Sequence, residues 1–135
     1  MEYPTISHFI MTRKVLAILT LIAVAAISAL ATWNPKIFSF IRSIPMGDKI
    51  GHFAIFGFVT YSIVSAIPGK HSVLYGASIT AIIVLLEESL QIYSPNRTFS
   101  FLDLGASLLG VIVVSSILYL SSKKSALSNR IEPGT

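Results

Sequence analysis

Four long runs of apolar residues make up most of the chain, and polar or turn-forming residues separate them. The runs cover residues 15–33, 50–67, 73–93 and 101–121. Each run has the length of roughly 17–25 residues that a helix needs to cross a bilayer. The runs are apolar on every face, unlike the amphipathic helices of soluble proteins, and they lack the alternation of a β-barrel strand. The sequence therefore predicts an all-α membrane protein, with residues 1–135 forming a single domain built as a four-transmembrane-helix bundle.

Turn-forming residues mark the ends of these predicted helices. Asn34-Pro35 ends the first run, Pro68-Gly69 forms a turn after the second, and Ser94-Pro95-Asn96 ends the third. Residues 34–49 form the one long connection, where aromatic and basic side chains predict a short amphipathic segment in the membrane interface. Residues 122–135 are polar, and we expect them to form a flexible cytoplasmic tail.

Composition excludes several classes of protein. The chain is 53% hydrophobic and only 12% charged, whereas soluble domains are about 25% charged. An ordinary soluble enzyme and a disordered chain are therefore both excluded. The chain has no cysteine, so it can form neither a disulfide nor a thiolate metal site. It contains no Walker loop, Rossmann glycine pattern or nucleophile elbow.

Basic residues are distributed unequally between the two ends of the predicted bundle. One end would carry six of them, which are Arg13, Lys14, Lys70, Lys123, Lys124 and Arg130. The other end would carry four, which are Lys36, Arg42, Lys49 and Arg97. The positive-inside rule then predicts that both termini are cytoplasmic. This orientation accounts for the net charge of +4, and we expect no nucleic-acid partner.

The N-terminus allows two interpretations. Arg13-Lys14, an apolar run and Ala29-Leu30-Ala31 also resemble a signal peptide with its cleavage site. The length of the run and the interfacial anchor Trp33 favour a retained helix. Met11 is an alternative start that would leave a short basic leader. Both questions stay open at this stage.

Ionisable residues are costly inside a membrane, at about 2.5–3.5 kcal/mol each at a helix centre, so their positions are informative. They occur at the start of the second predicted helix, at the end of the third, in the loop that follows and at the start of the fourth. The residues are Asp48, Lys49, His52, Glu87, Glu88, Gln91, Arg97 and Asp103. Four crossings bring all of these positions to the same membrane depth, and the predicted orientation makes that side the outer one. The sequence thus predicts one outward-facing polar site.

Glu88 lies about 7–8 Å below the end of its predicted helix, at 1.5 Å per residue, and its carboxylate needs a partner or a proton. We expect the partner to be His52, Lys49 or Arg97. Glu88 and Gln91 are three residues apart on one helix face, which we expect to point into the bundle. Glu87 lies about 100° away on the same helix and would face another neighbour or lipid headgroups. A structural lock and a working site are both compatible with this pattern.

The predicted site carries more negative than positive charge. Four acidic and two basic side chains give a formal charge of −2 when His52 is neutral. A phosphate would therefore require protonated carboxylates or a bridging divalent cation. No metal-ligand spacing is visible in the sequence, so we expect no metal and no cofactor.

These residues also form an ordered pattern. Asp48-Lys49-x-x-His52-Phe53 comes first, Glu88-x-x-Gln91-x-x-x-Pro95-x-Arg97 follows, and Asp103 and Gly110 come last. This set, which covers about residues 46–113, resembles the VanZ-like family. Family members often carry Asn four residues after the Asp, whereas this chain has Ser107. A site that needs the amide would be weakened by that difference.

The resemblance implies a small multi-pass protein of the bacterial cytoplasmic (inner) membrane. The family takes its name from a protein linked to low-level resistance to the glycopeptide antibiotic teicoplanin, and most members have no established reaction. The matched positions are Asp48, Lys49, His52, Glu88, Gln91, Arg97 and Asp103. An outward-facing site implies a role in the cell envelope, because lipid-linked wall precursors and glycopeptides lie on that side.

Four hypotheses of function follow. In the first, the protein recognises a lipid-linked precursor, a lipid headgroup or a glycopeptide. Its ligand-binding residues would be Asp48, Lys49, Gln91, Arg97 and Asp103, and its rim Trp33, Tyr93, Phe99 and Phe101. In the second, it is an enzyme with Glu88 as general base, His52 as proton partner and Arg97 stabilising negative charge. The third is a proton-coupled carrier that uses Glu88 and His52 and works as a homo-oligomer. The fourth is a structural subunit.

Overall fold

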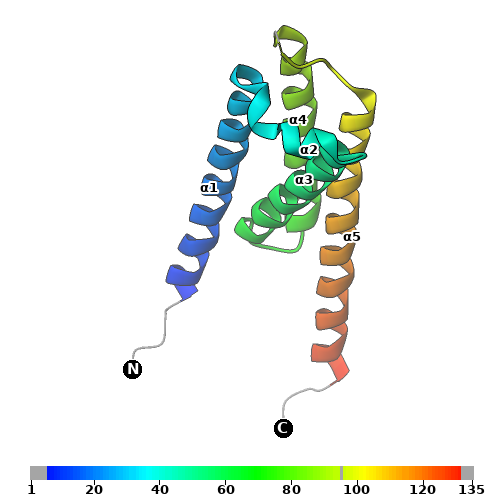
Figure 1. Cartoon of the computed structure of the whole chain (residues 1–135). Helices are drawn as coiled ribbons and strands as arrows, with labels where there is room; N and C mark the ends of the chain where they lie inside the picture. The colour runs from blue at the N-terminus through cyan, green and yellow to red at the C-terminus, as the bar shows by residue number, and fades with distance from the viewer. Residues whose placement is uncertain (1–5, 95, 132–135) are drawn as a thin grey trace.

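The computed structural model describes residues 6–94 and 96–131, and all regular structure in that part of the chain is helical (Figure 1). Its long helices are α1 (Ile6–Trp33), α3 (Gly47–Ala66), α4 (Ser72–Leu90) and α5 (Phe101–Ile131). Its short ones are η1 (Pro35–Phe38), α2 (Ser39–Ser43) and η2 (Gln91–Tyr93).

Within residues 6–94 and 96–131, four helical segments are long and apolar enough to cross a membrane. They are Met11–Trp33, Gly47–Ala66, Ser72–Tyr93 and Phe101–Leu127. The prediction of an all-α chain with four such helices is therefore confirmed, and these helices suggest a multi-pass membrane protein.

The helix boundaries differ from the predicted ones mainly at the two ends of the chain. Helix α1 already begins at Ile6, ahead of the predicted start at Val15. Helix α5 runs on to Ile131, although the sequence predicted a flexible tail from Ser122. Residues 122–131 are thus helical; they include good helix formers such as Ala, Leu and Lys and meet no Gly or Pro before Pro133. Residues 132–135 of the predicted tail lie outside the described residues.

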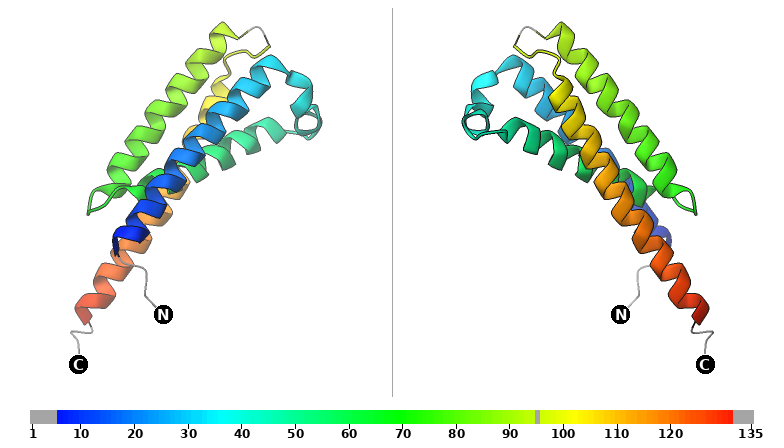
Figure 2. Two further views of the ribbon diagram at one scale, coloured as in Figure 1. Left: turned by 90° about the vertical axis from the view of Figure 1, so that its left-hand side faces the viewer. Right: turned by 90° about the vertical axis from the view of Figure 1, so that its right-hand side faces the viewer.

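Helix α3 is the centre of the bundle and packs against α1, α4 and α5. Its buried residues Phe56, Val59 and Ile63 form one core cluster with Val84 of α4 and Val111 of α5. Figure 2 shows that α3 runs at a tilt to the other three long helices and that α1 and α5 lie along the same direction. The described start of α1 and the described end of α5 lie at the same end of the bundle (Figure 1).

Helices α3 and α5 are in close backbone contact. A Cβ atom on Gly110 would overlap the carbonyl oxygen of Phe53, and one on Gly57 would lie 3.2 Å from the side chain of Val114. Small residues at such positions let two helix backbones approach closely, which is how helices associate where water supplies no driving force. Gly110 therefore fixes α5 against the first half of α3.

Burial follows the pattern of a membrane protein. Many Leu, Ile and Phe side chains on the long helices are exposed, whereas the fully buried side chains include Thr60, Ser62, Thr80, Ser107 and Glu88. An apolar outer surface of this extent suits a lipid environment. The buried hydroxyls of Thr60 and Thr80 donate to carbonyls one helical turn earlier, at 2.7 and 2.9 Å, so they need no water.

Candidate functional site

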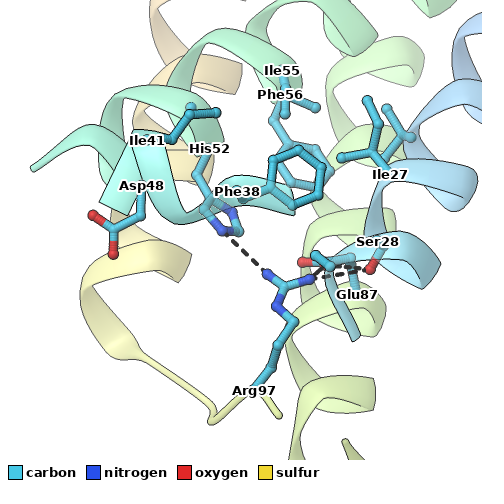
Figure 3. A pocket seen from close by; sticks show the side chains of 13 residues that line it. Ile27, Ser28, Phe38, Ile41, Asp48, His52, Ile55, Phe56, Glu87 and Arg97 are labelled. Atoms are coloured by element: carbon cyan, nitrogen blue, oxygen red, sulfur yellow. Dashed lines mark hydrogen bonds and ion pairs between the residues drawn. The ribbon is translucent and has the colours of Figure 1, made fainter. Parts of the chain in front are cut away.

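The polar residues predicted from the sequence meet at one end of the bundle, opposite the start of α1. The first two turns of α3 supply Asp48, Lys49 and His52, and the last turn of α4 supplies Glu87 and Glu88. The other contributors are Gln91 of η2, Arg97 of the link to α5, and Asp103 and Ser107 of α5. Figure 3 shows the part of this group that faces a cavity.

Arg97 connects three elements through its guanidinium group. Its Nη1 atom lies 3.0 Å from Oε1 of Glu87 and 3.3 Å from Oγ of Ser28 on α1. The hydroxyl of Ser28 in turn donates to Oε1 of Glu87 at 2.8 Å. Both charged side chains are largely buried, at 13% exposed for Arg97 and 14% for Glu87. This triad ties α1 to the end of α4, as the dashed lines of Figure 3 show.

His52 lies between Arg97 and helix α5. Its Nε2 atom is 3.5 Å from Nη2 of Arg97, and its Nδ1 atom is 3.1 Å from Oγ of Ser107. A guanidinium only donates hydrogen bonds, so this contact assigns an acceptor role to Nε2. In the neutral tautomer that accepts at Nε2, the ring proton is on Nδ1 and faces the hydroxyl of Ser107. Ser107, where VanZ-like proteins often have Asn, thus contacts the predicted histidine.

Lys49 links α3 to α5. It forms ion pairs with the neighbouring Asp48 and with Asp103, whose Oδ1 atom is 3.0 Å from its Nζ atom. The backbone N–H of Asp103 donates to Oγ of Ser100 at 3.3 Å, which caps the start of α5. Lys49 is thus the cation that pairs with Asp103 at the start of α5.

Glu88 is almost completely buried, at 1% exposed. Its Oε1 atom accepts the backbone N–H of Ser100 at 2.6 Å, and its Oε2 atom accepts Nε2 of Gln91 at 3.3 Å. The expectation that Glu88 pairs with His52, Lys49 or Arg97 was wrong. The link that leads into α5 brings the N–H of Ser100 to Glu88, while Arg97 reaches the adjacent Glu87.

The predicted directions of the two glutamates are otherwise supported. Glu88 and Gln91 both lie inside the bundle, since Gln91 is only 4% exposed. Glu87 faces a neighbouring helix through Ser28, which is one of the two alternatives that the sequence left open. Gln91 also donates to Oε2 of Glu87 at 2.9 Å, so it bridges the two carboxylates.

A cavity of about 150 Å³ opens beside this network, between α1, α3 and the segment formed by η1 and α2. One wall is apolar and includes Ile27, Phe38, Ile41, Ile55 and Phe56. The polar part of the lining, called the polar wall below, consists of Ser28, Asp48, His52, Glu87 and Arg97 (Figure 3), and the ring of His52 stacks on that of Phe56. With His52 neutral, the two carboxylates and the guanidinium give this wall a formal charge of −1.

Not every predicted site residue lines this cavity. Lys49, Glu88, Gln91 and Asp103 lie behind the wall and hold its members in place. Sequence reasoning missed Ser28, because it considered ionisable residues and Ser28 carries none of that signal. Ser28 is nevertheless one of three hydroxyl residues, with Thr20 and Thr32, in an otherwise apolar run. A hydroxyl near the outer end of that run was the available sign that it contacts the polar site.

His52, Glu87 and Glu88 could together hold a metal ion. Each offers one ligand atom, and these three atoms lie within 4.8 Å of one another. The sequence gave no metal-ligand spacing because the ligands come from two helices. The guanidinium of Arg97 already contacts both His52 and Glu87, so a cation would have to displace it.

Comparison with protein-family models, curated proteins and solved structures found no match to this chain. The resemblance to the VanZ-like family thus rests on the residues of the sequence alone. The geometry of the polar network is the starting point for a functional assignment.

Proposed function

We propose that this chain is a VanZ-like protein of the bacterial cytoplasmic membrane, with its polar site on the outer side, and that it binds the head of a cell-envelope lipid there. The observation that carries the proposal is the mixed lining of the cavity. The polar side chains of Asp48, His52, Glu87 and Arg97 and a set of apolar side chains line one space within a bundle of membrane-spanning length. A molecule with a polar head and an apolar body matches that arrangement.

The orientation follows from the basic residues. Lys123 and Lys124 lie near the described end of α5, at the end of the bundle remote from the site (Figure 1). Lys70 lies in the turn between α3 and α4. The positive-inside rule favours the cytoplasm for this end, and the site then faces outward, where lipid-linked wall precursors are exposed.

The paired charges favour a head that donates hydrogen bonds. Lys49 is engaged by Asp48 and Asp103, and Arg97 is engaged by Glu87. A phosphate could bind Arg97 only if it displaced the carboxylate of Glu87 from the guanidinium. The cavity would then hold the phosphate and an unpaired carboxylate, in a polar wall that already has a negative formal charge. Hydroxyl or ammonium groups can instead donate to the carboxylates of Asp48 and Glu87, each of which can accept more than one hydrogen bond. Sugar-bearing and amine-bearing heads therefore suit the wall best.

Size separates the candidate ligands further. About 150 Å³ holds roughly five water molecules, at about 30 Å³ each in the liquid. A glycopeptide antibiotic is much larger than this space, whereas a single sugar or an ethanolamine group is closer to it. The cavity therefore favours a lipid head over a glycopeptide.

The enzyme hypothesis is less well supported than recognition. Glu88, its general base, is buried behind the wall, and its two oxygens accept hydrogen bonds from Ser100 and Gln91. A general base must reach the proton that it removes. Glu88 instead contacts Gln91, which also donates to Glu87, and Ser100, which precedes α5. These contacts suit a role in holding Glu87 and the start of α5.

Native mass spectrometry of the protein in nanodiscs tests the proposal. The lipids compared are glucosyl-diacylglycerol, phosphatidylethanolamine and phosphatidylcholine, the last of which has no donor in its head. We expect wild type to retain the first two preferentially, and Glu87→Gln and His52→Ala to lose that preference. Lys123→Gln, remote from the cavity, is the control. Equal retention of all three lipids by wild type would contradict the proposal.

The orientation has its own test. The chain is free of cysteine, so Asn96→Cys and Ser72→Cys each introduce a single thiol. An impermeant maleimide added to intact cells should label position 96 and spare position 72. The opposite labelling pattern would invert the proposed orientation and place the site on the cytoplasmic side.

A further inference from the structure

The polar cavity is too small for a whole lipid. Its volume of about 150 Å³ is below the roughly 300–1,000 Å³ typical of small-molecule sites. A head that enters it must therefore leave the rest of its molecule elsewhere. The structure offers one continuous path for that remainder.

A second, larger hollow of about 490 Å³ continues from the polar cavity along the groove between α1 and α3. Val24 and Ile27 of α1 and Ile55 of α3 line both spaces. These three residues therefore lie at the border between the two spaces. The remaining residues of the groove are Leu19, Thr20, Ala23, Ala54 and Phe58.

The wall of the groove is apolar in practice. Its one polar side chain, Thr20, donates to the carbonyl of Leu16 at 2.8 Å and lies 3.2 Å from Oγ of Ser62. Its hydroxyl is therefore satisfied within the protein. A charged or hydrated occupant would find no partner here, whereas a hydrocarbon chain needs none.

The dimensions of the groove also fit a chain. From Leu19 to Ala31, the α1 residues that line the two spaces cover twelve helical steps, or about 18 Å at 1.5 Å each. This is more than half of a hydrocarbon core about 30 Å thick. Alanine at positions 23 and 54 leaves the groove open between the two helices.

We propose that this groove binds the hydrocarbon chain of the same lipid whose head occupies the polar cavity. The inference rests on the proposed function and adds the second half of the ligand. The shared lining of Val24, Ile27 and Ile55 argues for one molecule, because a head in the cavity has its exit there. Its class is a lipid with a small donor-bearing head and at least one long chain.

A photoreactive lipid tests this inference. The probe is glucosyl-diacylglycerol with a diazirine in one acyl chain, in nanodiscs with the full-length protein. We expect crosslinks on the peptides that contain Leu19–Ile27 and Ala54–Phe58. Excess unlabelled glucosyl-diacylglycerol should remove them, and excess phosphatidylcholine should not.

Matched variants separate the groove from the remaining lipid surface. Ala23 lies in the groove, whereas Ala25 is two residues on, about 200° around α1, exposed and outside both spaces. Ala23→Trp should lower the competed crosslinking at least about tenfold, while Ala25→Trp should leave it within about twofold of wild type. Ala54→Phe fills the groove from the α3 side and should act like Ala23→Trp.

The outcomes that overturn the inference differ from those that overturn the proposed function. If donor-bearing heads are retained but Ala23→Trp and Ala25→Trp crosslink alike, the groove does not hold the chain and the head site stands. If cysteines at Ala23 and Phe58 form disulfides between two copies, a second protein chain fills the groove instead. If wild type retains no lipid preferentially, the proposed function itself fails.

Discussion

The two sides of helix α3 are built in different ways. On the α5 side, Gly110 lets the two backbones touch, and a single added Cβ atom would clash. On the α1 side, the helices touch at Thr20 and Ser62, and a cavity and a groove lie along the rest of their contact. Polar contacts close that side at its upper end, where Ser28 meets Glu87 and Asn96 donates to the carbonyl of Thr32 at 2.7 Å.

The difference indicates how rigidity and access are divided. The close α3–α5 contact places His52 against Ser107 and Lys49 against Asp103, so the part of the polar wall that α3 supplies, Asp48 and His52, stands on well-packed helices. The looser α1 side leaves the space that a ligand needs. A binding site gains precision when its groups stand on rigid elements, and here the open side can yield without moving them.

Removing Arg97, which holds the α1 side of the bundle to α4, should cause the largest loss of stability. In Arg97→Ala, the largely buried carboxylate of Glu87 loses its cation, and we expect the free energy of unfolding to fall by about 3 kcal/mol. Denaturant titration in detergent measures it. The double variant Glu87→Gln/Arg97→Ala should recover part of the loss. No recovery would mean that the ion pair does not hold α1 and α4 together.

Adding one methyl group should damage the packed side nearly as much. Gly110→Ala places a Cβ atom against the carbonyl oxygen of Phe53, and we expect a loss of about 1–3 kcal/mol. Gly105→Ala is the matched control on the same helix, because its Cβ atom would meet nothing within 4 Å. If both variants unfold at the same denaturant concentration, α3 and α5 are not in close contact.

Ser107→Ala tests the contact between the packed side and the polar wall. We expect a loss of about 1 kcal/mol, because the Nδ1 proton of His52 loses its buried acceptor. Nitrogen chemical shifts of the imidazole should show a mixture of tautomers in this variant and one tautomer in wild type. Ser107→Asn, which restores an acceptor, should keep the single tautomer; equal spectra for all three proteins would reject the assignment.

Filling the cavity should have the smallest effect on stability. Gly51 lines the polar cavity, and an added Cβ atom would meet nothing within 4 Å. Gly51→Ala should therefore leave unfolding unchanged or stabilise the helix by about 0.5–1 kcal/mol. Thermal unfolding in detergent measures this, and a clear destabilisation would mean that the α1 side is as tightly packed as the α5 side.

Much of the fold could be predicted from the sequence because membrane spans have a simple signal. Four uninterrupted apolar runs predicted four helices, and their alternating direction brought His52, Glu88, Arg97 and Asp103 to one end. Helix α5 was harder to delimit, because a polar composition does not end a helix that lacks Gly or Pro. The predicted orientation and the family resemblance remain predictions.

The pairing of charges could not be predicted in the same way. Glu87 and Glu88 are adjacent, and which of them receives Arg97 depends on how the link before α5 folds. That link directs the N–H of Ser100 to Glu88 and the guanidinium of Arg97 to Glu87. Ser28 could not be predicted for a related reason. Its role depends on its hydrogen bond to Glu87 of α4, which the sequence of α1 does not reveal.

The junction between α2 and α3 gives one residue unusual control over the polar wall. Met46 has φ 58° and ψ 16°, and it is the one non-glycine residue with positive φ in the described ranges. This left-handed backbone sets the direction in which α3 begins. The first two turns of α3 carry Asp48, Lys49 and His52. A β-branched residue resists this conformation, so Met46→Ile would swing these three side chains together without touching any of them.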